Sequence, residues 1–140
     1  MKAEELFAGA LVRVNHDGLC IKKGTIVVVR AVDADDKLIE KGLVGSAHCR
    51  PLDDQFEGGI WCEYLDPIPL TDEILEKNGF ERSKVFVEWK YENENVYMIY
   101  KPFPYLKIQT EKCIVAFPCK YVHELQNAFR LCRIEKTIEL

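Results

Sequence analysis

The chain has 140 residues, of which 48% are hydrophobic and 30% are charged. This composition is typical of a globular protein with one domain or two small modules, and it excludes a disordered or fibrous chain. The 19 basic and 23 acidic residues give a net charge of −4, which excludes a general electrostatic attraction to nucleic acids or anionic lipids.

The start of the chain predicts no export. Residues 1–5 are mostly charged, whereas a signal peptide needs a basic start followed by an apolar segment. The longest aliphatic run, at residues 26–29, is far shorter than the ~18 residues that indicate a membrane span. We therefore expect a cytoplasmic protein that does not bind membranes.

The first half of the chain has the pattern of a small β-module. Short apolar runs at residues 11–14, 26–32, 38–39 and 60–65 predict β-strands. Asp17-Gly18 and residues 33–36 predict turns between them, because Asp hydrogen-bonds its own backbone and Gly allows a positive φ. Together with Gly9 near the first strand, these features predict an SH3-like barrel that closes most of its sheet edges.

Pro67 and Pro69 mark a boundary between two modules, because proline removes a backbone donor and restricts the residue before it. We expect an SH3-like β-module over residues 1–68 and an α+β module over residues 69–140. The second module begins with a helix predicted at residues 72–78. Thr71 can cap this helix, and Gly79 can end it.

The remaining segments predict an antiparallel meander covered by a second helix. Strands are predicted at residues 84–91, 96–101, 107–109 and 113–117, with turns at 92–95 and 110–112. Apolar residues at helical spacing predict an amphipathic helix over residues 120–132, and residues 138–140 alternate like a short edge strand. The predicted fold class is α+β: an SH3-like small β-barrel followed by an antiparallel β-meander with two helices.

Three segments carry a resemblance to a known family. They are MKAEEL at residues 1–6, PIPLT at 67–71 and YVHELQN at 121–127. In this order they resemble an uncharacterised family of small proteins from gut anaerobic bacteria and their prophages and mobile elements. That family has no assigned activity. The resemblance therefore implies a cytoplasmic accessory role, borne by a phage or mobile element, and it transfers no catalytic residues.

The cysteines predict neither a metal site nor an active thiol. Six of them occur, at positions 20, 49, 62, 113, 119 and 132, and without export they are expected to be reduced and buried. Structural zinc favours paired ligands such as C-x₂-C, and none is present, although His48, Cys49 and Cys62 come nearest to a ligand set. We predict no metal and no cofactor.

A thiol enzyme would need a base beside its cysteine. The plausible base is His123, with Cys113, Cys119 or Cys132 as the nucleophile, but no orienting motif accompanies them. We therefore predict that the protein is not an enzyme, and a small thiol or hydrolytic enzyme is the disfavoured alternative.

The predicted function is that of a non-enzymatic protein-interaction module. Four hydrogen-bonding side chains are predicted on one face of the last helix: His123, Gln126, Asn127 and Arg130. This face either is solvated or recognises a partner. Another protein, of unknown identity, would bind at this face or at an exposed strand edge.

Binding of single-stranded nucleic acid is the alternative from a different class. Its candidate residues are the aromatic Trp89, Tyr91 and Tyr97 and the nearby lysines Lys90 and Lys101. Aromatic rings on a sheet can stack bases, but they can equally pack a core without any ligand. Residues 71–140 carry 11 basic and 11 acidic side chains, so the charge of this half does not favour phosphate.

Overall fold

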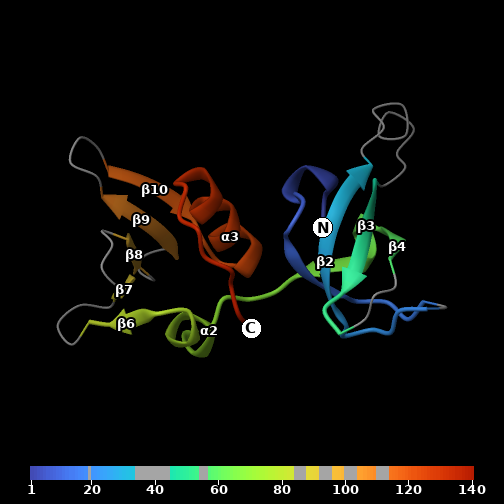
Figure 1. Ribbon diagram of the computed structural model, residues 1–140, viewed down its shortest axis with the longest axis horizontal. Coiled ribbons are helices and arrows are strands. Elements are labelled where there is room, and N and C mark those ends of the chain that lie inside the picture. Colours follow the sequence, from blue (N-terminus) through green and yellow to red (C-terminus); the bar gives the residue numbers. More distant parts are fainter. Residues whose placement is uncertain are drawn as a thin grey trace. The chain divides into compact units, whose positions relative to one another are not determined.

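A computed structural model describes residues 1–18, 20–33, 45–53, 57–83, 88–91, 96–99, 104–109 and 114–140. In these residues the chain is an α+β protein with two antiparallel sheets and two α-helices (Figure 1). It divides into two units, Met1–Ile68 and Pro69–Leu140. None of the described helices is long and apolar enough to cross a membrane. The strand predicted at residues 38–39 and the turns at 92–95 and 110–112 lie outside the described residues.

The N-terminal unit is built on a five-stranded antiparallel sheet with the order β4-β3-β2-β1-β5. Its elements are η1 (Ala3–Glu5), β1 (Leu11–Val14), β2 (Ile26–Asp33), β3 (Ser46–Pro51), β4 (Gly58–Trp61), the 3₁₀-helix η2 (Cys62–Tyr64) and β5 (Leu65–Pro67). Strands β4 and β5 are the edges of this sheet. The described strands therefore form an open sheet, and the expected closure into a barrel is not observed.

The prediction of a single strand over residues 60–65 is wrong. Strand β4 ends at Trp61, and the chain then turns through η2, where the Leu65 N–H donates to the Cys62 carbonyl. This turn lets β5 pair with β1 on the other side of the sheet. Strand β3 was not predicted, because its buried residues are Ala47, Cys49 and Pro51, which form no aliphatic run, and polar residues alternate with them.

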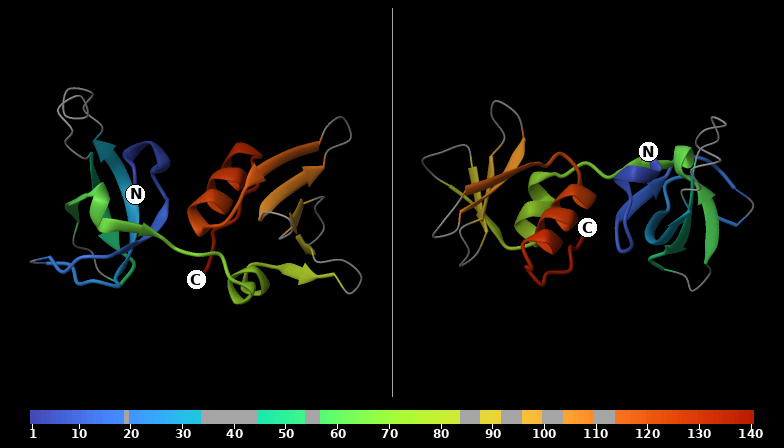
Figure 2. Two further views of the ribbon diagram at one scale, coloured as in Figure 1. Left: turned by 180° about the vertical axis from the view of Figure 1, so that it is seen from behind. Right: turned by 90° about the horizontal axis from the view of Figure 1, so that it is seen from above.

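The core of the N-terminal unit follows from the alternation of side chains along its strands. The fully buried residues are small and mostly branched, among them Val12, Val27, Val29 and Leu65. Figure 2 shows the sheet from two further sides, with β2 and β3 as its longest strands. Branched side chains suit a pleated, half-buried surface.

The C-terminal unit contains a five-stranded antiparallel sheet with the order β10-β9-β8-β7-β6. Its elements are α2 (Asp72–Lys77), β6 (Phe80–Arg82), β7 (Glu88–Tyr91), β8 (Val96–Ile99), β9 (Tyr105–Gln109), β10 (Ile114–Pro118) and α3 (Val122–Leu131). Most of these agree with the predicted meander and helices within a few residues. Strand β6 was not predicted, and residues 84–87 of the long predicted strand lie outside the described part.

Helix α3 packs on one face of this sheet through aromatic residues. The ring of Phe129 stacks on that of Phe80 at 6.2 Å and contacts the ring of Tyr91 at 5.3 Å. Phe80 and Phe129 are almost completely buried. At the start of the helix, the Glu124 carboxylate accepts the N–H of Tyr121 at 3.0 Å, which satisfies a backbone donor there. These contacts form the core of the C-terminal unit.

The predicted edge strand at residues 138–140 is also wrong. This segment is irregular, and it is held by the side chain of Asn78, which follows α2 and is fully buried. The Asn78 amide nitrogen donates to the Glu139 carbonyl at 2.7 Å, and its oxygen accepts the Glu139 N–H at 2.9 Å. A side-chain amide therefore replaces the neighbouring strand that the sequence pattern suggested.

Candidate binding pocket

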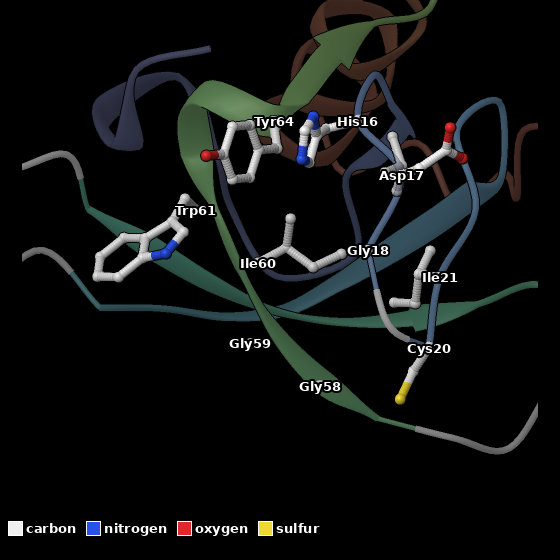
Figure 3. A pocket seen from close by; sticks show the side chains of 11 residues that line it. His16, Asp17, Gly18, Cys20, Ile21, Gly58, Gly59, Ile60, Trp61 and Tyr64 are labelled. Carbon is white, nitrogen blue, oxygen red and sulfur yellow. The ribbon is translucent and has the colours of Figure 1, made fainter.

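A pocket of about 640 Å³ lies in the N-terminal unit between strand β4 and the connection that joins β1 to β2. Figure 3 shows β4 along one wall and residues of the connection along the other. The lining residues are Val14, His16, Asp17, Gly18, Cys20, Ile21, Gly58, Gly59, Ile60, Trp61 and Tyr64. A volume of this size falls in the range of ~300–1,000 Å³ that ligand sites occupy.

The connection is held against the end of the sheet by Asn15. Its side-chain amide donates to the Glu63 carbonyl at 3.2 Å and to the Asp66 carboxylate at 2.7 Å, and its backbone N–H donates to the Tyr64 carbonyl at 2.9 Å. Further along, the Lys23 N–H donates to the Asp17 carboxylate at 2.9 Å. Four hydrogen bonds thus fix this wall of the pocket.

Two stacked rings form one end of the pocket. His16 follows Asn15, and its ring lies 4.6 Å from that of Tyr64 with an angle of 21° between the planes. Tyr64 ends η2, so the turn that separates β4 from β5 also brings this ring to the pocket. Figure 3 shows the two rings side by side. They offer apolar faces to a ligand.

The other wall combines an exposed tryptophan with two glycines. Trp61 ends β4, and 49% of its surface is exposed, which is unusual for so large an apolar side chain. Gly58 and Gly59 precede it on the same strand, with Ile60 between. A Cβ atom added to Gly59 would meet no atom within 4 Å, so the strand is uncrowded here. Glycine inside a strand often marks a close approach of another backbone.

The pocket also contains a thiol, an imidazole and a carboxylate. Cys20 is exposed, contrary to the expectation that the cysteines are buried. In Figure 3 its sulfur lies at the opposite end of the pocket from His16, and the Asp17 carboxylate points away from the His16 ring. In the described part of the chain, no hydrogen bond joins any two of these three side chains. Nucleophilic catalysis needs a base in contact with the thiol, and this arrangement does not provide one.

The residues predicted for partner binding do not form one exposed face. His123 is only 6% exposed, and its ring stacks on that of Tyr121 at 5.8 Å. His123 is buried because the side of α3 that packs in the core is wider than its apolar residues alone suggest. Gln126 and Asn127 are half-buried and Arg130 is exposed, with its guanidinium donating to the Asn127 side chain at 2.9 Å. The structure thus leaves three of the four residues at the surface.

The residues predicted to bind nucleic acid lie on different faces of the sheet. Trp89 is 3% exposed and belongs to the core, and Tyr91 packs against Phe129. Lys90 and Tyr97 are partners across β7 and β8, so they share the opposite face. Lys101 lies outside the described residues. The ring with the largest stacking surface is therefore inaccessible to a base.

Cys49, Cys62 and Cys119 have the properties of buried apolar residues, whereas Cys132 is half-buried. Burial, and to a lesser degree the neighbouring Cys62, raises the pKa of the Cys49 thiol to about 12. Burial and the Glu124 carboxylate likewise raise the pKa of Cys119 to about 12. Such thiols stay protonated at neutral pH and are poor nucleophiles. Cys113 lies outside the described residues. Among the described residues, no group of three or more His, Cys, Asp or Glu side chains is placed to hold a metal ion.

Comparison of the chain with protein-family models, with curated proteins and with solved structures finds no match. The pocket is therefore interpreted from its own residues. Sequence reasoning missed it because residues 60–65 were predicted as one strand, which hid the turn that brings Tyr64 beside His16. The signal that could have found it is the pair Gly58-Gly59 followed closely by Trp61 and Tyr64, since glycines interrupt a strand pattern where a ligand or backbone comes close.

Proposed function

We propose that the protein is a non-enzymatic, cytoplasmic interaction module whose N-terminal unit binds a segment of another protein in the pocket lined by His16, Trp61 and Tyr64. The strand order of this unit and the short η2 before its last strand support its interpretation as an SH3-like module. The resemblance to a family from prophages and mobile elements supports an accessory role.

The observation that carries this proposal is the exposed Trp61 beside two other rings. Interfaces between proteins are rich in Trp and Tyr, and a few such residues contribute most of the binding energy. The described lining residues do not place a base on the Cys20 thiol, so the pocket favours binding over catalysis. The aromatic and aliphatic lining residues suit apolar side chains of a peptide segment.

The direct test is selection of peptides from a displayed random library on the purified protein. Selected peptides are titrated while tryptophan fluorescence is followed, because Trp61 is half exposed and Trp89 is buried. We expect Trp61→Ala to weaken binding by ~30-fold or more, which is the loss of a residue worth ~2 kcal/mol.

Leu52→Ala is the matched control. Leu52 belongs to the same unit and is 52% exposed, but it does not line the pocket. This variant should bind the selected peptides like the unaltered protein, and thermal unfolding should show both variants folded. Failure to select any peptide, or equal binding by Trp61→Ala and Leu52→Ala, would contradict the proposed function.

A further inference from the structure

The pocket lies along β4, which is an edge strand of the sheet formed by the described residues. Strand β4 pairs only with β3 in the sheet order, with Ile60 opposite Ala47 and Gly58 opposite Cys49. Next to β4, the Cys62 N–H donates to the Gly45 carbonyl at 2.9 Å, so this pair is hydrogen-bonded.

Hydrogen-bonded and non-hydrogen-bonded pairs alternate along antiparallel strands. Since position 62 bonds toward β3, Ile60 and Gly58 do so as well, and the backbone groups of Gly59 and Trp61 point away from β3. The Trp61 carbonyl belongs to the N-cap of η2 and is used by that 3₁₀-helix, so the groups directed away from β3 that remain for a partner are the Gly59 N–H, the Gly59 carbonyl and the Trp61 N–H. The edge of β4 therefore presents two donors and one acceptor beside the pocket.

We infer that the partner binds as an added β-strand along β4, with its backbone paired to Gly59 and Trp61. This inference rests on the proposed function and specifies how the pocket is used. The two glycines leave room for a second backbone, and the rings of Trp61, Tyr64 and His16 line the space into which alternate side chains of the added strand would extend.

Charge indicates which segment fits. The N-terminal unit carries eight basic and twelve acidic residues, a net charge of −4, and a basic segment is attracted to it. Lys or Arg side chains of the partner can also lie over the exposed faces of the aromatic rings. The expected occupant is an extended segment of another protein that alternates apolar or aromatic residues with Lys or Arg and has no proline at the paired positions.

Strand β10, one of the two edge strands of the other sheet, is a poorer acceptor of an added strand. Strand β10 exposes Ile114 and Val115, but no described pocket borders it, and its last residue, Pro118, has no N–H to donate. Compared with β10, β4 therefore combines outward backbone groups with a ring-lined pocket beside it.

The test compares Gly59→Pro with Gly59→Ala in binding a peptide selected from the library. Proline at position 59 removes one N–H that points away from β3, so the sheet itself loses no hydrogen bond, whereas alanine retains this N–H. We expect Gly59→Pro to bind ~10-fold more weakly than Gly59→Ala, since both variants add a side chain at position 59 but only proline leaves a bound carbonyl without its donor.

A second measurement uses the unaltered protein, so it does not depend on the folding of a variant. Each amide of the selected peptide is N-methylated in turn. Strand addition predicts ~10-fold losses at alternate amides and little effect between them. Trp61-dependent binding that is insensitive to every N-methyl group would overturn strand addition while leaving the proposed function standing.

Two other outcomes also overturn the inference. Selected peptides with proline at the paired positions would show a different mode of recognition. Analytical ultracentrifugation that finds a dimer of the unaltered protein and a monomer of Gly59→Pro would show that a second copy of the chain occupies the edge. Selection of no peptide at all contradicts the proposed function itself, so the two failures are distinguishable.

Discussion

The two units use their aromatic residues in opposite ways. In the C-terminal unit the rings of Phe80, Trp89 and Phe129 are buried between the sheet and α3. In the N-terminal unit the rings of Trp61 and Tyr64 lie at a pocket. The number of aromatic residues in a segment therefore does not indicate which rings can bind a ligand. What decides it is whether a helix covers the face that carries them.

Replacing the buried tryptophan gives the largest expected effect and tests this comparison directly. Trp89→Ala removes a core side chain that is 3% exposed, and we expect the free energy of unfolding to fall by ~3–5 kcal/mol in urea titrations. Trp61→Ala, at a half-exposed position, should cost ~0.5 kcal/mol or less. Trp89→Ala should therefore lose stability, whereas Trp61→Ala should lose peptide binding and keep its stability.

The opposite result would favour the nucleic-acid alternative. If Trp89→Ala remained stable and the unaltered protein bound a labelled single-stranded oligonucleotide at low salt in a Trp89-dependent manner, the ring would be accessible after all. Such binding should weaken steeply with added salt, because it depends on contacts to phosphates. Absence of oligonucleotide binding at low salt agrees with a core position for Trp89.

Much of the secondary structure was predictable because local signals were strong. The Thr71 side chain caps α2 by accepting the Ile74 N–H, as the sequence suggested, and the apolar spacing of α3 gave that helix. Strands β3 and β6 were missed because they are short or interrupted by polar residues. The burial of His123 was not predictable, since it depends on how α3 packs on a sheet built from distant segments.

Replacing Asn78, which holds the tail of the C-terminal unit, should have an intermediate effect on stability. Asn78 is fully buried, and its side chain holds both backbone groups of Glu139. Asn78→Ala leaves these groups without partners, and we expect a loss of ~2–3 kcal/mol in the free energy of unfolding. Hydrogen exchange should show the Glu139 amide losing protection before the amides of α3 do.

Asn127→Ala is the control for this variant. Asn127 is half-buried on α3 and accepts a surface hydrogen bond from Arg130, so its replacement should cost ~0.5 kcal/mol or less. Equal losses for the two variants would mean that the contacts of Asn78 with the tail contribute no more than a surface hydrogen bond.

The pocket shows where sequence reasoning reaches its limit. Its residues come from positions 14–21 and 58–64, and nothing local indicates that these two segments meet. The hydrogen bonds of Asn15 to Glu63, Tyr64 and Asp66 bring them together. Such contacts depend on the register of β1 with β5, which is set by the whole sheet.

The last effect concerns a feature that the two units share, a buried thiol with a pKa raised to about 12, at Cys49 and at Cys119. Because the folded-state pKa lies above the ordinary value of 9.0, these thiols favour folding fully below pH 9.0, and this contribution is lost as the pH rises from 9.0 toward about 12. The difference in unfolding free energy between the unaltered protein and Cys49→Ala should therefore shrink by ~1 kcal/mol per pH unit in this window. Cys20→Ala, which removes an exposed thiol from the same unit, is measured beside it as the matched control. If the difference in unfolding free energy for Cys49→Ala did not change with pH, the thiol at position 49 would ionise in the folded protein as it does in the unfolded chain. The core around Cys49 would then be more open to water than its burial indicates.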